Sequence, residues 1–132
     1  MEKKIVLTRP DFERLKKYLS AQGGAVHLKQ LAAEAENCLI VEPQEIEGAV
    51  VTMNSVAEVE DMKTGEKEKY KLVWPEDADV AEDKISVLAP LGAALIGYRE
   101  GDEVELSAPA GVRRVKIAKV HYQPEAEGRY DL

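Results

Sequence analysis

The chain has 132 residues, 45% of them hydrophobic, and a formal net charge of −7. This length suits one compact domain, and this composition excludes a globally disordered chain. The chain has one cysteine, a charged start, and no apolar run near the roughly 20 residues of a spanning helix, so we expect a cytoplasmic protein without disulfides, membrane segments or a signal peptide.

Residues 1–48 are predicted to form a short antiparallel helical hairpin. Thr8 and Asp11 have the spacing of a capping box, and Pro10 suits the first turn of a helix. Apolar residues then recur at intervals of three and four on either side of the glycine-containing segment 20–25. They are Phe12, Leu15 and Leu19 in the first helix, and Leu28, Leu31, Ala35, Cys38 and Leu39 in the second, which stops before Pro43.

The hairpin holds the basic part of the chain. Residues 1–30 contain seven Lys and Arg against three Asp and Glu, a net charge of +4, which leaves −11 for residues 31–132. The acidic remainder would repel phosphates, so we expect no sequence-specific nucleic-acid binding. The basic residues form either a solvated helix face, the simpler interpretation, or a small positive surface that meets an acidic or nucleotide-rich site on a partner. This face comprises Arg14, Lys16, Lys17 and Lys29.

From residue 49 the apolar period changes to two, which predicts a mainly antiparallel sheet. Strands are expected at 50–52, 55–61, 67–74 and 85–88, in a segment that ends at 107, and at 113–122. Pro90 and Gly97 suit the two ends of a short helix over 90–96. The predicted fold is α+β, with the hairpin followed by a sheet domain over residues 49–132.

The last expected strand is predicted to contain a bulge. Its apolar residues shift from one phase, Val115 and Ile117, to the other, Ala118 and Val120. Because side chains alternate between the two faces of a strand, an extra residue is needed to keep both pairs facing the core.

Few residues have the spacing of a chemical site. His27, His121 and Cys38 lie far apart, so no metal site is predicted. Segment 76–83 holds five Asp and Glu but lacks the central glycine and final glutamate of a calcium-binding loop, which favours a solvated loop. The chain has no glycine-rich phosphate loop and no G-x-S-x-G or Cys–His nucleophile pattern. We expect no catalytic residue, no metal and no cofactor.

One long segment resembles a known family. Residues 84–122, KISVLAPLGAALIGYREGDEVELSAPAGVRRVKIAKVHY, resemble the C-terminal domain of the Gre transcript-cleavage factors, whose pattern is I-S-x-x-S-P-x-x-x-A-L-x-G, then G-D, a P-x-G turn and a final V-x-x-x-x-Y strand. The resemblance continues back through residues 50–75. VVTMNS at 50–55, APLGAAL at 89–95 and HYQPEAEGRYDL at 121–132 are similar to a Gre-related group, the regulators of nucleoside diphosphate kinase. The resemblance implies an FKBP-like fold for residues 49–132.

The resemblance also implies a partner and a docking site. In the Gre family, the strand–loop–helix that matches residues 85–96 docks on the β′ subunit of RNA polymerase near the secondary channel. Pro90 matches the family proline, whereas Leu88 and Ala89 replace a polar pair. The residues expected to contact the polymerase are Leu88, Ala89, Pro90 and Leu91, while Ile85, Val87, Leu95 and Ile96 are expected in the core.

The expected function is that of a non-catalytic, monomeric regulator that binds RNA polymerase and competes with Gre-type factors. Any effect on nucleoside diphosphate kinase would then be indirect, through gene expression. Two alternatives stay open: a Gre-type transcript-cleavage factor, or a polymerase-independent modulator of a metabolic enzyme. Against the first, Gre factors use acidic residues at the hairpin tip to hold a metal ion, and residues 20–30 contain no Asp or Glu.

Overall fold

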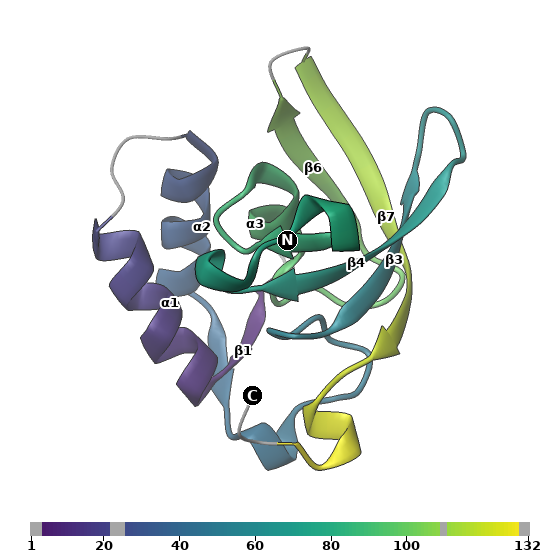
Figure 1. The fold of residues 1–132 in the computed structure, drawn as a ribbon. Coiled ribbons are helices and arrows are strands. Elements are labelled where there is room, and N and C mark those ends of the chain that lie inside the picture. The colour runs from purple at the N-terminus through teal and green to yellow at the C-terminus, as the bar shows by residue number, and fades with distance from the viewer. Residues whose placement is uncertain (1–3, 22–25, 109–110, 130–132) are drawn as a thin grey trace.

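The structure, a computed structural model, describes residues 4–21, 26–108 and 111–129. A twisted five-stranded sheet forms the centre of the fold, and a pair of helices lies along one side of it (Figure 1). This arrangement confirms the predicted α+β class, with an N-terminal helical hairpin and one further short α-helix. None of the described helices has the length and apolar run that crossing a bilayer requires.

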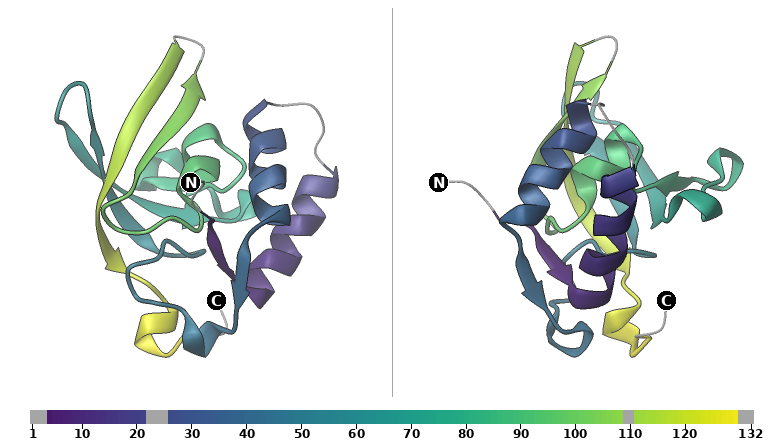
Figure 2. Two further views of the ribbon diagram at one scale, coloured as in Figure 1. Left: turned by 180° about the vertical axis from the view of Figure 1, so that it is seen from behind. Right: turned by 90° about the vertical axis from the view of Figure 1, so that its left-hand side faces the viewer.

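The hairpin consists of α1 (Arg9–Ala21) and α2 (Val26–Glu36), which lie side by side in each view (Figure 2). Leu15 of α1 and Leu31 and Ala35 of α2 are buried, as their spacing indicated. The opposite faces of both helices carry charged side chains and remain exposed.

The prediction that the second helix continues through Cys38 and Leu39 is wrong. α2 ends at Glu36, and Leu39–Val41 instead form strand β2, which pairs in parallel with β1 (Val6–Thr8). The two antiparallel helices bring the chain back beside its start, where two short apolar runs can share backbone hydrogen bonds. Leu39 is consequently 54% exposed instead of lying on the apolar face of a helix.

The main sheet has the order β5-β4-β3-β7-β6, and only the pair β4–β5 is parallel. Its strands are β3 (Val56–Asp61), β4 (Lys67–Val73), β5 (Lys84–Ser86), β6 (Glu103–Ala108) and β7 (Gly111–Tyr122). The short helix α3 (Pro90–Leu95) contacts α2, β5 and β6. Single turns of 3-10 helix lie in the connections at Pro43–Glu45, Pro75–Asp77, Val80–Glu82 and Glu125–Glu127.

These five strands and α3 confirm the sequence prediction, apart from small shifts of their ends. The expected strand at 50–52 is reduced to one isolated antiparallel bridge, between Val50 and Arg99, and a turn closed by the Ser55 N–H and the Thr52 carbonyl (3.1 Å) begins at Thr52. Val51 also hydrogen-bonds to this segment after α3: its N–H donates to Tyr98 O at 2.8 Å, and its carbonyl accepts from Gly97 N at 2.9 Å.

The predicted bulge in the last strand is confirmed. Glu58 of β3 is paired with Lys119 of β7, and the next residue, Val59, is paired with Ile117. Ala118 is therefore the extra residue. A second register shift, between Val56 and Ala57, follows two residues later on β7.

One hydrophobic core joins the hairpin to the sheet domain. Ile5, Leu7, Leu15 and Leu31 belong to the same buried cluster as residues of the sheet and of α3, among them Leu72, Val87, Leu95 and Ile117. The two predicted parts of the chain, residues 1–48 and 49–132, therefore share one core. The domain boundary between them stays a prediction.

Asp11 links α1 to the sheet domain through a buried carboxylate. The residue is only 5% exposed, and its Oδ2 accepts a hydrogen bond from Met53 N at 3.2 Å. Its own N–H donates to Thr8 Oγ1 at 3.4 Å, which is one half of the predicted capping box. Burial raises the pKa of Asp11 to about 6; the hydrogen bond from Met53 opposes the rise, and the nearby Glu125 carboxylate adds to it.

Asp11→Asn should remove a pH dependence of stability that the wild-type chain has. The ordinary pKa of this group is 3.8, so between pH 4 and 6 the folded state retains a proton that the unfolded state has released. Stability therefore falls as the pH rises through this window. Urea unfolding at each pH should show the wild-type free energy of unfolding, relative to the variant, dropping by about 2–3 kcal/mol from pH 4 to 7. A difference that is constant with pH would contradict this assignment.

Candidate functional site

The four residues expected to contact a partner lie on the tight turn between β5 and α3. Ser86 shapes this turn, because its Oγ accepts from Leu88 N and its carbonyl oxygen accepts from Ala89 N, both at 3.0 Å. α3 then begins at Pro90, in the first turn, where a proline loses no helical hydrogen bond. Leu91 follows in the helix, so local hydrogen bonding brings the four residues together.

This turn presents apolar side chains at the surface. Pro90 is exposed, and Leu88, Ala89 and Leu91 are half-buried. Leu88 and Leu91 also pack against the hydrophobic core, so part of each side chain supports the fold. The structure thus places the four residues on one surface, and their contact with a polymerase stays a prediction.

The neighbouring residues expected in the core are largely there. Val87, Leu95 and Ile96 are buried, and Ile85 is half-buried. Gly92 allows α3 to lie directly on the turn, since a Cβ at this position would clash with the carbonyl oxygen of Ser86 and sit 3.1 Å from Leu72 Cδ1. The position of the whole surface depends on this close approach.

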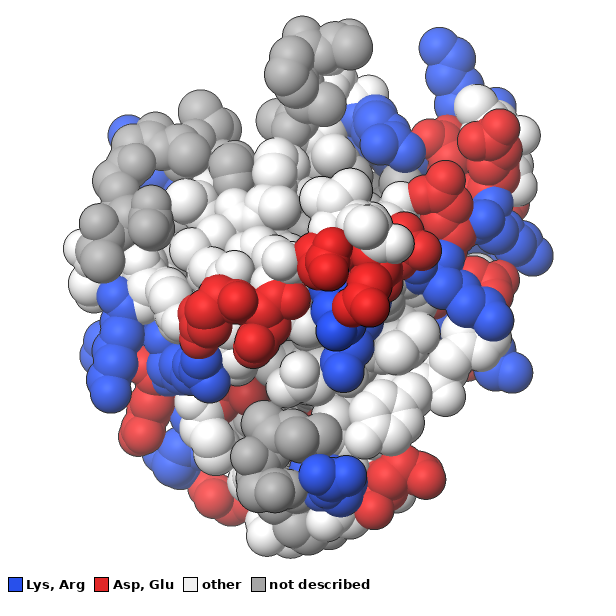
Figure 3. Space-filling view, viewed as in Figure 1, with Lys and Arg blue, Asp and Glu red and all other residues white. Residues whose placement is uncertain are grey.

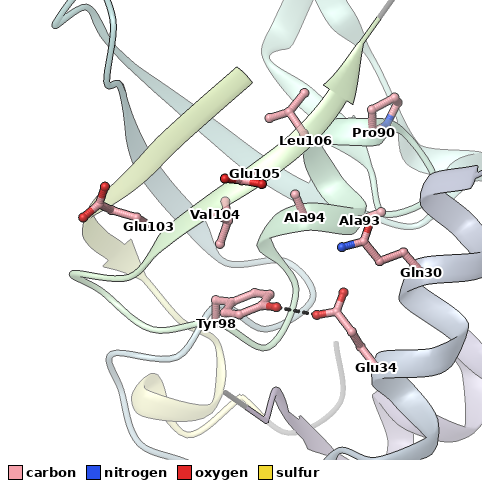
Figure 4. Close-up of a pocket in the computed structure, with 10 residues that line it drawn as sticks. All are labelled: Gln30, Glu34, Pro90, Ala93, Ala94, Tyr98, Glu103, Val104, Glu105 and Leu106. Atoms are coloured by element: carbon pink, nitrogen blue, oxygen red, sulfur yellow. Dashed lines mark hydrogen bonds between the residues drawn. The ribbon is translucent and has the colours of Figure 1, made fainter. Parts of the chain in front are cut away.

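A groove of about 250 Å³ lies beside the turn, between α2, α3 and β6 (Figure 4). Pro90 lines it, so the groove adjoins the candidate contact surface. The Tyr98 hydroxyl donates a hydrogen bond to the Glu34 carboxylate of α2. Burial is the main cause that raises the pKa of both groups; the hydrogen bond adds to the rise for Tyr98 and opposes it for Glu34.

Arg14, one of the expected basic residues, is engaged within the molecule. Its guanidinium forms an ion pair with Glu76 and lies 4.4 Å from the centroid of the Trp74 ring. Tyr18 stacks on the same ring, with centroids 5.4 Å apart and planes inclined by 16°, and its hydroxyl donates to Glu76. The hydrogen bond from Tyr18 and the charge of Arg14 lower the pKa of Glu76. We call this group the aromatic clamp, and it joins α1 to the loop after β4.

The other three residues of the expected basic face, Lys16, Lys17 and Lys29, are exposed. Lys16 Nζ lies 5.9 Å from the centroid of the Phe12 ring. Figure 3 shows Lys and Arg side chains at the left, over α1, beside a band of acidic side chains in the centre, over the projecting loop after β4. The basic face is therefore short and bordered by acidic residues, and the tip residues 22–25 lie outside the described part of the chain.

The acidic loop is ordered by its own contacts. Asp79 Oδ1 accepts from Ala81 N at 3.0 Å, and Glu82 forms an ion pair with Lys84 at 3.0 Å. Within residues 4–21, 26–108 and 111–129, no group of three or more His, Cys, Asp or Glu side chains is arranged to hold a metal ion.

Comparison with known proteins connects this fold to transcription factors. A family model described as "Transcription elongation factor, GreA/GreB, C-term" matches residues 45–122. A solved structure, a prokaryotic transcription elongation factor GreA/GreB from Nitrosomonas europaea, has a TM-score of 0.77 and 39% identity, and the match covers 92% of this chain and 100% of that one. This likeness confirms the predicted fold type, a short hairpin followed by a GreA/GreB C-terminal-like domain.

Two relatives differ in how much of their length is matched. The chain is 40% identical over 93 residues to transcription elongation factor GreA of Syntrophobacter fumaroxidans, which is 70% of this chain and 60% of the relative. It is 35% identical over 131 residues to the regulator of nucleoside diphosphate kinase of Escherichia coli K12, which is 97% of this chain and 96% of the relative. The chain thus spans only part of the GreA factor and nearly all of the second relative.

Gly92→Ala should destabilise the fold and displace α3 from the Ser86 turn. The added methyl group would overlap backbone that cannot move as a flexible side chain can, so we expect a loss of about 1–3 kcal/mol in urea unfolding. Gly48→Ala is the matched control, because a Cβ there would meet only Ala126 Cβ at 3.6 Å, an ordinary contact. Equal stability of the two variants would contradict the close packing of α3 on the turn.

Proposed function

Because the chain belongs to the GreA/GreB transcription elongation factor family, we propose that it is a non-catalytic regulator that binds RNA polymerase. One observation carries this proposal: a Gre-type C-terminal domain is joined to a hairpin of only 13 and 11 helical residues. Such a chain keeps the domain that docks in the Gre factors and lacks a long arm. It would occupy the β′ subunit near the secondary channel and compete there with Gre-type factors.

The turn between β5 and α3 is the proposed docking surface. Leu88, Ala89, Pro90 and Leu91 lie together, and Pro90 is exposed at the start of α3. Half-buried apolar side chains on a rigid turn lose little conformational entropy on binding, which suits an anchor. The exposed Lys16, Lys17 and Lys29 would add a weaker, long-range attraction that salt screens.

Leu88→Asp should weaken binding to purified core RNA polymerase. A carboxylate at the centre of an apolar contact should cost about 2 kcal/mol, or about 30-fold in Kd. The loss should persist at high salt, since the contact is apolar and only the lysine contribution is screened. Circular dichroism must show that the variant folds.

A second variant and a control guard against an indirect effect. Pro90→Asp changes an exposed position in the first turn of α3, where an acidic residue is favourable, so this variant should fold and also bind weakly. Leu39→Asp makes the same exchange as Leu88→Asp at an exposed leucine on β2 and should bind like wild type. Wild-type affinity in both folded turn variants would overturn the proposed surface.

The hairpin should not support transcript cleavage. α1 has 13 residues and so spans about 20 Å at roughly 1.5 Å per residue. Residues 20–30 supply no carboxylate for a hard metal ion such as Mg²⁺. In a backtracked elongation complex with Mg²⁺, the chain should leave release of short 3′ RNA fragments at the rate of polymerase alone, while a GreA factor raises it. Cleavage above that rate would favour the alternative, a Gre-type cleavage factor.

The name of the Escherichia coli relative favours a second candidate, direct modulation of nucleoside diphosphate kinase. Under the main proposal this effect is indirect and passes through gene expression. The two differ in a measurable way: a direct modulator would bind the purified kinase without polymerase present.

A further inference from the structure

Strand β6 leaves one edge of the main sheet open. It is the last strand in the order β5-β4-β3-β7-β6, and no strand of the described chain pairs with its outer side. In an antiparallel pair, every second residue directs its N–H and C=O away from the partner strand. The outer edge of β6 therefore offers a row of backbone donors and acceptors.

The open edge of β6 borders the groove beside α2 and α3. Val104 and Leu106 of β6 are buried, whereas Glu103 and Glu105 are exposed, and all four line the groove (Figure 4). A larger hollow of about 610 Å³ continues from it toward the start of β1. The two share Gln30, Glu34, Tyr98 and Glu103 as lining residues, so they form one elongated channel along α2.

The charge of the groove is negative. Glu34, Glu103 and Glu105 line the part beside β6, which has no Lys or Arg among its lining residues, and Lys4 lines only the larger hollow toward β1. Glu105 is partly neutralised by an ion pair with Arg114. Glu34 is half-buried, and its hydrogen-bond partner is a neutral phenol, that of Tyr98. A half-desolvated carboxylate beside an uncharged partner gains from an added cation.

We infer that this groove binds an extended, basic segment of a partner protein. The backbone of the segment would add to β6 as a further strand, and alternate Lys or Arg side chains would face Glu34 and Glu103. Charge disfavours the other obvious occupant, β6 of a second copy, because antiparallel registers centred on Val104 or Glu105 would place glutamates opposite one another. The inference does not depend on which protein carries the segment. Its test is therefore independent of whether the turn before α3 docks on RNA polymerase.

A short synthetic peptide of alternating Arg and Thr tests the inference against the full chain. It should bind saturably in an NMR titration, and at saturation the outward-facing amides of β6 should exchange more slowly with solvent. A peptide of alternating Glu and Thr should not bind. Because the N–H groups of alternate residues lie on the same edge of a strand, N-methylation of one alternate set in the Arg peptide should abolish binding and methylation of the other set should not.

Matched variants distinguish binding in the groove from a general attraction of the basic peptide to an acidic chain. Glu34→Gln and Glu103→Arg combined in one chain should weaken peptide binding at least about tenfold. Glu34→Gln keeps an acceptor for the Tyr98 hydroxyl. Glu66→Arg makes the same change as Glu103→Arg in the exposed turn before β4, outside the groove, and should bind the peptide within about twofold of wild type. Absence of saturable binding, binding without slower exchange on β6, or an equal effect of Glu66→Arg and Glu103→Arg would each overturn the inference.

Discussion

The helical hairpin of this chain is held against the sheet by a single hydrophobic core, and the remaining features depend on that attachment. Leu15 and Leu31 place one face of each helix in the same buried cluster as the sheet residues. Removing such side chains from water is the main favourable term in folding, so a hairpin this short needs the sheet in order to be stable. The packing of Leu15 and Leu31 therefore sets how the hairpin lies on the sheet domain.

Polar contacts then fix how the hairpin sits on that core. A hydrogen bond from Met53 N to Asp11 holds the start of α1. The aromatic clamp holds the middle of α1 through the contacts of Arg14 and Tyr18 with Glu76. These contacts lie on different segments of the sheet domain, so together they limit rotation of α1 about its axis. The attachment also places α2 beside α3, and this packing forms the groove along β6. The two candidate surfaces of the molecule, the turn before α3 and the groove, are thus products of one arrangement.

Local pattern explains which parts could be predicted from the sequence. The bulge at Ala118 and the short helix from Pro90 depend on residues close to one another in the chain, and both were predicted correctly. The four residues of the turn were also placed together, because Ser86 organises them through bonds to its near neighbours.

Long-range pairing accounts for what was missed. Cys38 and Leu39 continue the apolar spacing of α2, and only the return of the chain beside β1 makes Leu39–Val41 a strand. The Arg14–Glu76 pair joins residues 62 positions apart, so Arg14 could be read only as part of a basic face. The same holds for the Glu34–Tyr98 pair of the groove, since α2 and the segment after α3 meet only in the folded chain.

The central claim is that this small GreA/GreB-type protein acts by occupying RNA polymerase. The most direct measurement is displacement of a fluorescently labelled GreA factor from purified core polymerase by the unlabelled chain, followed by fluorescence anisotropy. The account predicts saturable displacement, with full recovery of the free GreA signal at excess chain. Tight binding of both proteins at once, or no displacement at any concentration of folded chain, would contradict it.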